Sequence, residues 1–247
     1  MNPAFKVVIP ARYASTRLPG KPLRDMLGKP MIQWVYEAAL ASRAEQVVVA
    51  TDDQAIADAV NQFGGECCMT REGHPSGTDR IVEVCETPSW DDDDIVVNLQ
   101  GDEPLMPPQN LTQVANNLDK SAAHMATLHK SIDEQQAGNP NLVKLVCDHD
   151  GQCLYFSRSP IPYDRDGIGV EYCGHIGLYA YRVGFLKTYA SMKPCSIEKS
   201  EQLEQLRALY HGYRIHTQLA LKTPGIGVDT EQDLVEVTQQ LMNNNYQ

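Results

Sequence analysis

The sequence predicts an α/β fold in which a mostly parallel sheet carries helices on both faces. Short runs rich in Val and Ile alternate with amphipathic stretches of helix length, which is the order expected of a parallel sheet with crossover helices. Several of the runs, such as DIVVNLQ at 94–100, lack polar–apolar alternation and therefore suit strands that are buried on both faces. The pattern changes after about Met125, where two short apolar runs flank a turn that ends at Gly151. The second half of the chain is therefore expected to add a small antiparallel excursion.

In the first half, strands and helices are expected to alternate regularly. The spacing of Thr51 and Gln54 matches a capping box, which would begin a helix that ends before Gly64 and Gly65. The predicted strands are 5–10, 46–50, 66–70 and 94–100. The predicted helices are 31–43, the one that Thr51 caps and that runs through Phe63, 78–86 and one that starts at Pro107 or Pro108.

The second half is predicted to open with a hairpin formed by residues 142–147 and 152–157. Further strands are expected at 174–181 and 213–220, and helices at 197–210 and 230–242. Asp233 lies at capping-box spacing from Thr230, at the start of the last helix. With no repeat or linker, the chain is expected to form one domain over residues 1–247.

The composition predicts a cytosolic protein that does not bind nucleic acid or membranes. A formal net charge of -11 repels nucleic acid and anionic membrane surfaces, so a local basic cluster is informative. The seven cysteines show no C-x-x-C spacing, which argues against a zinc or redox site. No apolar run approaches the roughly 20 residues needed to span a bilayer. The N-terminus reaches a strand-like run without a signal-peptide pattern.

The loop after the first predicted strand carries three cations, Arg12, Arg17 and Lys21, within ten residues. Arg and Lys together with backbone amides are the usual means of holding phosphate groups. A solvated basic turn is an equal alternative on composition alone. The loop has neither the glycine spacing of a P-loop nor that of a dinucleotide-binding motif, so a nicotinamide-dependent dehydrogenase loses most of its support.

A second loop, QGDEP at 100–104, follows the buried strand at 94–100. Ligands of parallel sheets bind beyond the carboxyl ends of the strands, where Asp102 would be placed to hold Mg²⁺. An ordinary acidic turn is the alternative. Asp229 lies in a glycine-rich loop before the last helix, and its local sequence favours a helix cap over a metal ligand.

Three further polar segments are ambiguous on their own. Residues 76–80 (SGTDR) suit either an anion site at a helix start or simple capping. Arg158 follows one predicted strand and His175 opens another, and each is more often structural than functional when taken alone. The remaining histidines make no metal-ligand spacing.

Taken in order, these segments resemble the 3-deoxy-manno-octulosonate cytidylyltransferases, or CMP-Kdo synthetases, over essentially the whole chain. Nine motifs in sequence make the resemblance specific. They are IPARY at 9–13, STRLPGKPL at 15–23, ATDD at 50–53, HPSGTDR at 74–80, NLQGDEP at 98–104, LYFSR at 154–158, HIGLY at 175–179, LEQLR at 203–207 and GVDT at 227–230.

The resemblance implies a cytosolic, Mg²⁺-dependent enzyme with a Rossmann-like nucleotidyltransferase fold. Such an enzyme makes CMP-Kdo from CTP and 3-deoxy-manno-octulosonate (Kdo), releases pyrophosphate and supplies lipopolysaccharide synthesis. The family is typically dimeric, and residues of about 125–195 would form the part that faces the sugar and the second subunit.

The resemblance also implies a role for each matching residue. Arg12, Ser15 and Lys21 resemble triphosphate ligands, and Ser76, Thr78, Asp79 and Gln100 resemble neighbours of the nucleotide. Gln100, Arg158, His175, Tyr179, Glu204 and Gln205 resemble sugar-acid contacts, Asp102 and Asp229 resemble the metal ligands, and Arg12, Lys21 and Asp102 would carry the catalysis. Asp229 is thereby raised from a helix cap to an expected metal ligand.

The segment at 165–175, RDGIGVEYCGH, departs from the family because it is shorter than usual. Since the segment precedes the sugar-facing strand, a modified Kdo such as an amino-substituted form is an alternative substrate, as is another keto-sugar acid. A non-catalytic nucleotide-binding module is a more distant alternative. The pairing of Asp102 with Asp229 argues against it, because binding alone would not require two metal carboxylates.

Overall fold

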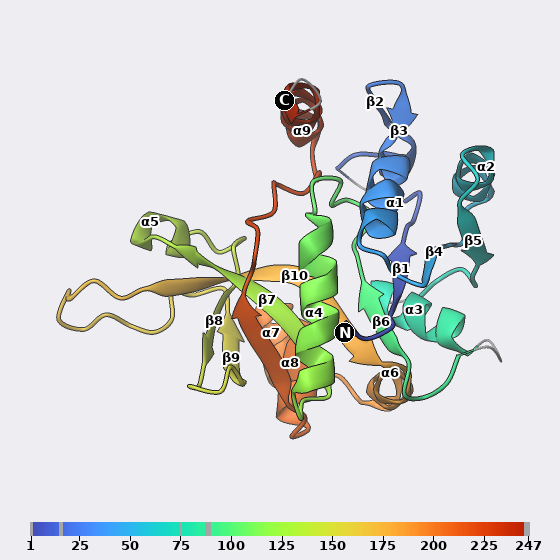
Figure 1. The fold of residues 1–247 in the computed structure, drawn as a ribbon. Coiled ribbons are helices and arrows are strands. Elements are labelled where there is room, and N and C mark those ends of the chain that lie inside the picture. Colours follow the sequence, from blue (N-terminus) through green and yellow to red (C-terminus); the bar gives the residue numbers. More distant parts are fainter. Residues whose placement is uncertain (1, 15–16, 75, 87–89, 245–247) are drawn as a thin grey trace.

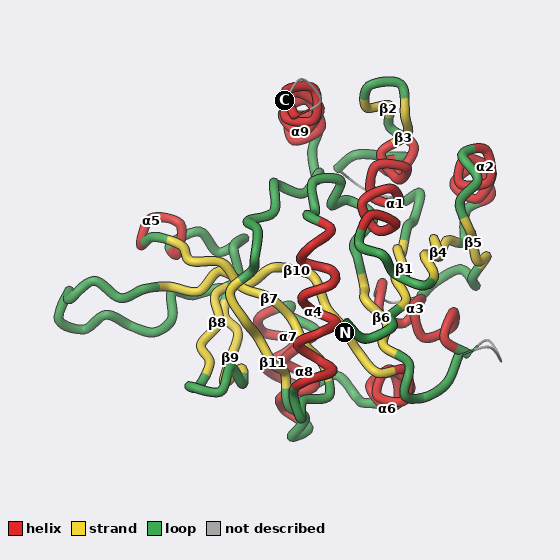
Figure 2. Tube along the Cα trace, viewed as in Figure 1, coloured by secondary structure: helices red, strands yellow, loops and turns green. Residues whose placement is uncertain are grey.

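The computed structural model describes residues 2–14, 17–74, 76–86 and 90–244, which form a nine-stranded sheet flanked by helices (Figures 1 and 2). The strands of this sheet are β1 (Lys6–Pro10), β4 (Gln46–Thr51), β5 (Glu66–Met69), β6 (Ile95–Asn98), β7 (Met125–Ile132), β8 (Lys144–Cys147), β9 (Cys153–Ser157), β10 (Tyr172–Arg182) and β11 (Ile215–Leu219). The main order is β11-β7-β10-β6-β1-β4-β5, while β8 pairs with β10 and β9 pairs with β8. A separate ribbon is formed by β2 (Asp25–Met26) and β3 (Lys29–Pro30).

Short helices and longer crossover helices connect these strands. They are the 3-10 helix η1 (Lys21–Leu23), α1 (Met31–Ala41), α2 (Gln54–Gln62), α3 (Gly77–Cys85), α4 (Pro108–Lys120), α5 (Glu134–Ala137), α6 (Val183–Ser191), α7 (Ser196–Glu201), α8 (Gln205–Tyr210) and α9 (Glu231–Asn244). No helix among the described residues is both long enough and apolar enough to cross a membrane.

Parallel pairing in the first half confirms the predicted strands. Strands β6, β1, β4 and β5 lie side by side in parallel, with Val7 opposite Val47 and Val97 in the register. Alternate residues of these strands enter two different cores, so both faces of each central strand are buried. One face packs on α1, α2 and α4, and the other packs on α3, α6 and α8.

The parallel order is interrupted by β10, which runs antiparallel between β6 and β7. The predicted strand at 174–181 is therefore confirmed, but it lies in the middle of the sheet rather than in a peripheral excursion. The hairpin of β8 and β9 is the peripheral part, as predicted. β7 was not predicted, because the polar residues His129, Lys130 and Ser131 interrupt the apolar residues of this strand.

One predicted helix cap was wrong and another was confirmed. Thr51 is the last residue of β4, and Asp53 instead caps α2 by accepting a hydrogen bond from the Ile56 amide at 3.1 Å. At α9 the predicted reciprocal pair is present, because the Thr230 hydroxyl accepts from the Asp233 amide at 3.2 Å while an Asp233 oxygen accepts from the Thr230 amide at 2.8 Å.

The single helix predicted at 197–210 is in fact two helices, α7 and α8. Gln202 between them is left-handed, with φ 53°, and ends α7. The guanidinium of Arg158 donates to the carbonyls of Glu201 and Gln202 at 2.6 and 3.4 Å, so those carbonyls turn outward instead of continuing the helix. The break depends on a side chain from the end of β9, which local periodicity does not report.

Helix α9 lies apart from the sheet (Figure 1). It packs on the segment that follows β1, whose residues 11–21 we call the basic loop. Its Leu234 and Val237 share a small core with Leu18, Met26 and Met31. This packing holds α9 against the segment that follows β1. The loop that contains Asp229 lies just before α9 and is therefore held close to the same segment.

Candidate active site

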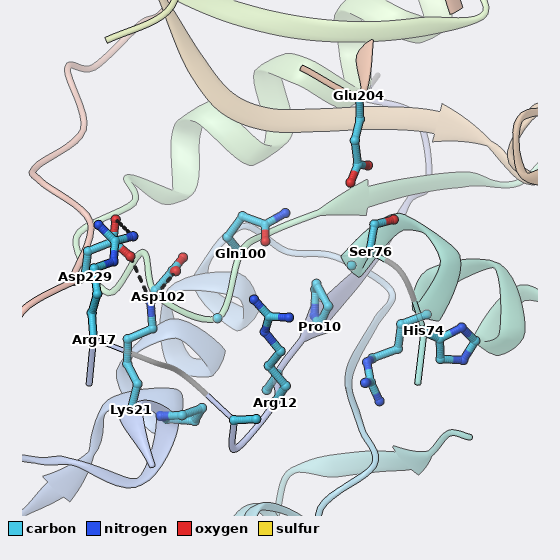
Figure 3. Close-up of a pocket in the computed structure, with 16 residues that line it drawn as sticks. Pro10, Arg12, Arg17, Lys21, His74, Ser76, Gln100, Asp102, Glu204 and Asp229 are labelled. Carbon is cyan, nitrogen blue, oxygen red and sulfur yellow. Dashed lines mark hydrogen bonds and ion pairs between the residues drawn. The ribbon is translucent and has the colours of Figure 1, made fainter. Parts of the chain in front are cut away.

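A cavity of about 700 Å³ lies beyond the carboxyl ends of β1 and β6. The position is the one expected for a ligand of a parallel sheet. Figure 3 shows the side chains that converge on it. They come from the loop after β1, the start of α3, the loop after β6 and the loop before α9, and comprise Pro10, Ala11, Arg12, Ala14, Arg17, Lys21, Pro22, His74, Ser76, Gly77, Arg80, Gln100, Gly101, Asp102, Glu204 and Asp229.

The basic loop takes its shape from a glycine. Gly20 is left-handed, with φ 64°, and a Cβ there would lie 3.3 Å from the ring of Tyr13. Its amide donates to the Tyr13 carbonyl at 3.2 Å, which closes the loop. Helix η1 then starts at Lys21, so the closed loop fixes where the Lys21 side chain leaves the backbone.

Lys21 lies between the two carboxylates that are expected to bind metal. Its ammonium donates to Asp102 Oδ2 at 2.6 Å, to the Val228 carbonyl at 2.9 Å and to Asp229 Oδ1 at 3.2 Å. Arg17 reaches the other oxygen of Asp229 at 3.1 Å. The structure therefore brings Lys21, Asp102 and Asp229 together, although they are distant in the sequence.

The loop after β6 can reach this point because of Gly101. A Cβ at this position would lie 2.9 Å from the Pro10 carbonyl, so only glycine lets the loop approach β1 this closely. The next carboxyl, Glu103, lies beside Gly227 rather than on Lys21. Burial, followed by the charges of Asp102 and Asp229, raises the pKa of Glu103 to about 8. Glu103 was given no role from the sequence, where it reads as part of an acidic turn.

The oxygen atoms around Lys21 suit a magnesium ion. Two carboxylates and a backbone carbonyl are hard oxygen donors of the type that Mg²⁺ prefers. A cationic group already lies among them, which shows that the arrangement accommodates positive charge. No cluster of three or more His, Cys, Asp or Glu side chains with metal-binding geometry occurs in the described ranges. The candidate ligands here are therefore two carboxylates and one backbone carbonyl.

On the opposite side of the cavity, the start of α3 presents Ser76 and Arg80. Ser76 caps the helix by accepting from the Asp79 amide at 3.2 Å, and its hydroxyl donates to Asp79 Oδ2 at 2.8 Å. Arg80 is buried and paired with Asp52 at 2.8 Å. In contrast, Arg12 makes no ion pair with any described residue and extends into the cavity (Figure 3). Ser15, the other expected triphosphate ligand, falls outside the described residues.

A second cavity of about 280 Å³ adjoins the first. Gly77, Gln100 and Glu204 line both cavities and mark the junction. The predicted sugar contacts Gln100, His175, Tyr179, Glu204 and Gln205 all line the second cavity, together with Gly77, Thr78, Asn98, Met125, Gly177, Tyr181, Tyr189, Gln202 and Leu203. Asn98, Tyr181 and Tyr189 were not predicted, although the first two lie in or close to predicted motifs.

The lining of the second cavity mixes polar and apolar groups and carries no cationic side chain among these residues. Burial, reinforced by the nearby His129, lowers the pKa of His175 to about 3 and keeps its ring neutral. Glu204 accepts a hydrogen bond from the Thr78 hydroxyl at 3.1 Å, and burial raises its pKa. The Tyr179 hydroxyl is buried without a hydrogen-bond partner among the described residues, so it can bind a ligand group.

Arg158 is the predicted sugar contact that this structure does not place in either cavity. Its guanidinium donates to the carbonyls of Pro140, Glu201 and Gln202. Arg158 thereby supports the α7–α8 connection, whose residues Leu203 and Glu204 line the second cavity. Its observed contacts are structural.

The arrangement agrees with a family comparison. Residues 6–215 match the family model described as cytidylyltransferase. The chain belongs to this family. The 3-deoxy-manno-octulosonate cytidylyltransferase of Vibrio vulnificus (strain CMCP6) is 54% identical, and the match covers 97% of this chain and 98% of that protein. The protein of the same description from Photobacterium profundum is also 54% identical, over 95% of this chain and 98% of its own.

Among solved structures, this member of the family resembles CMP:2-keto-3-deoxy-manno-octonic acid synthetase complexed with CTP. The TM-score is 0.93 at 44% identity, with coverage of 98% of this chain and 100% of that one. The predicted family and the predicted α/β nucleotidyltransferase fold are thereby confirmed.

The buried neutral His175 makes a prediction about stability and pH. Its pKa is about 3 in the folded state, against 6.5 for an ordinary histidine, so only the unfolded chain takes up this proton between pH 7 and pH 5. Acidification over this range should therefore lower the free energy of unfolding by about 2 kcal/mol through this one residue. His175→Gln should remove that part of the loss in urea unfolding curves. The exposed His149→Gln is the control, and parallel pH profiles for wild type and His175→Gln would contradict the assignment.

Proposed function

We propose that the protein transfers the cytidylyl group of CTP to the anomeric hydroxyl of Kdo and releases pyrophosphate. The observation that carries the proposal is the junction of two unlike cavities. One is lined by Arg12, Lys21 and a carboxylate pair, and the other by hydroxyls, amides and a neutral imidazole. Such a pair suits a polyanionic nucleotide that meets a hydroxyl-rich acceptor.

The residues of the first cavity support an in-line displacement. The sugar hydroxyl attacks the α-phosphorus, the bond from that phosphorus to the pyrophosphate oxygen breaks, and the hydroxyl proton is released. Arg12 and Lys21 stabilise the charge on the leaving pyrophosphate. Asp102 and Asp229 would hold Mg²⁺, which when bound lowers the pKa of the attacking hydroxyl and neutralises phosphate charge. No covalent enzyme intermediate is required.

The charge distribution also favours one orientation of the sugar acid. A carboxylate that entered the second cavity would meet Glu204 and no cationic side chain. We therefore place the carboxylate toward the basic cavity and the hydroxyl-bearing chain in the second cavity. There the Glu204 carboxyl and the unpartnered Tyr179 hydroxyl can bind its hydroxyl groups.

The related proteins support the choice of substrates. They are described as 3-deoxy-manno-octulosonate cytidylyltransferases, and the solved structure similar to this one is a complex with CTP. Supply of CMP-Kdo for lipopolysaccharide follows from this substrate pair. A cytoplasmic location agrees with the use of CTP and with the seven free cysteines.

Replacement of the metal carboxylate tests the reaction directly. Asp102→Asn should reduce pyrophosphate release with CTP, Kdo and Mg²⁺ by at least about 10³-fold, because the charge that holds the metal is lost. Asp119→Asn, whose carboxylate pairs with Arg182 at 3.6 Å, is the matched control and should keep normal turnover.

The same assay with a panel of acceptors separates the alternatives. Release only with amino-substituted Kdo or another keto-sugar acid would replace Kdo as the substrate. Failure of wild type with every acceptor would favour a nucleotide-binding module, and near-normal turnover of Asp102→Asn would overturn the metal assignment.

The proposed orientation of the sugar is tested at Glu204. Glu204→Gln should raise the KM for Kdo about tenfold and leave the KM for CTP within about twofold, because a carboxyl oxygen that can accept hydrogen bonds from sugar hydroxyls is replaced by an amide NH₂. A keto-sugar acid that is shortened at the hydroxyl-bearing end should be affected less by this substitution. Equal rises in both KM values, or equal losses with the long and short acceptors, would contradict this orientation.

We further propose that the enzyme is a homodimer joined through the arm between β9 and β10. This arm projects from the body on the side opposite α2 and β5 (Figure 1). It exposes 84% of Tyr163 and 83% of Ile168, the two highest values among the large apolar side chains of the described residues.

Sedimentation equilibrium should give the mass of two chains for wild type and of one chain for Ile168→Asp, because a buried charge would oppose association. Met242→Asp, on the exposed face of α9, is the control and should remain a dimer. A wild-type mass of one chain, or a dimeric Ile168→Asp, would rule out this interface.

A further inference from the structure

The ammonium of Lys21 is coordinated by oxygen atoms in the way that a small cation would be. Its three partners are Asp102 Oδ2, the Val228 carbonyl and Asp229 Oδ1, at 2.6, 2.9 and 3.2 Å. An ammonium has three N–H donors, so these contacts use its full hydrogen-bonding capacity. The side chain is only 13% exposed. Lys21 therefore lines the cavity while its ammonium is held by the carboxylates and the Val228 carbonyl.

The same oxygen atoms are those that would bind a divalent metal. A metal ion held by these oxygen atoms would lie close to the ammonium, and two like charges at close range repel each other. A divalent charge doubles this repulsion. The ammonium and a metal therefore compete for Asp102 and Asp229.

We propose that Lys21 is a resident counter-cation that gives way to the divalent metal and then moves to the triphosphate. Lysine suits this exchange because its charge is compact and its four-carbon stem is flexible. Lys21 already lines the basic cavity, so a rotation of its side chain can move the ammonium from the carboxylates to a phosphate. Metal binding by Asp102 and Asp229 and phosphate binding by Lys21 are thereby coupled, because the Lys21 ammonium takes part in both.

The exchange makes metal and triphosphate assist each other's binding. Metal on the carboxylates releases the ammonium for the triphosphate, and a triphosphate that accepts the ammonium clears the carboxylates for metal. The identity of the anion rests on the proposed function. The competition between Lys21 and the metal does not.

A neighbouring cation of the same loop provides a matched control. Arg24 pairs with Glu231 at 2.5 Å and does not contact Asp102 or Asp229. Arg24→Met removes one positive charge from the loop, as Lys21→Met does, but leaves the carboxylate pair and its ammonium unchanged. A comparison of the two variants therefore separates local competition from the general effect of net charge.

The test is Mn²⁺ binding to nucleotide-free protein, measured from the free-Mn²⁺ signal in electron paramagnetic resonance. Lys21→Met should bind Mn²⁺ at least about tenfold more tightly than wild type, and Arg24→Met should stay within about twofold of it. Lys21→Gln, which keeps hydrogen-bond donors but no charge, should behave like Lys21→Met and serves if that variant folds poorly. In calorimetry with saturating Mn²⁺, inorganic tripolyphosphate should bind at least about tenfold more weakly to both Lys21 variants.

Equal or weaker Mn²⁺ binding by Lys21→Gln would overturn the proposal, as would equal tightening in Arg24→Met. Unchanged tripolyphosphate affinity would also overturn it, because Lys21 would then have no second position. None of these measurements uses CTP or a sugar acid. Tighter Mn²⁺ binding together with weaker tripolyphosphate binding would support the exchange even in a protein that failed to make CMP-Kdo.

Discussion

The contact of one ammonium with two carboxylates organises the active site. Lys21 lies in the loop after β1, Asp102 in the loop after β6, and Asp229 before α9, at separations of 81 and 208 residues from Lys21. Apolar packing of α9 on Leu18 and Met26 holds the third segment against the first. Ion pairs and apolar packing therefore both hold the loop before α9 against the loop after β1. The cluster of Lys21, Asp102 and Asp229 forms only when these N-terminal and C-terminal segments have come together.

The remaining geometry of the site depends on the directions of three neighbouring strands, since β1 and β6 are parallel and β10 is antiparallel to β6. Parallel strands β1 and β6 end at the same edge, which puts the basic loop and the acidic loop side by side. The antiparallel β10 then lies next to β6, with Tyr179 opposite Asn98, and brings His175 and Tyr179 into the second cavity from the other direction. Glu204 and Gln205 join them because the helical segment after residue 196 is broken at Gln202. The two cavities follow from the parallel and antiparallel halves of one sheet.

Sequence reasoning succeeded where the determinants are local and failed where they are distant. The strand at 94–100 and the acidic residue after it could be predicted, because a buried parallel strand is a continuous apolar run. The contact of Asp229 with Lys21 could not be read from its sequence neighbours, because the two residues are 208 positions apart. The helix break at Gln202 was missed because the contacts that accompany it come from Arg158, which is distant in the sequence. Thr51 and Asp53 both fit a helix start, and the continuation of β4 through Thr51 decided between them.

Strand β10 divides its residues by parity. Ile176, Leu178 and Ala180 enter the core beneath α1 and α4, while His175, Gly177, Tyr179 and Tyr181 line the second cavity. The cavity face of β10 is also a packed face, because Tyr181 belongs to the second core and Tyr179 packs against that core. A substitution at either tyrosine would therefore alter the shape of the cavity and the packing of the sheet together. Gly177 is different, because a Cβ there would meet no atom within 4 Å. A side chain added at this one position could narrow the cavity without displacing the core.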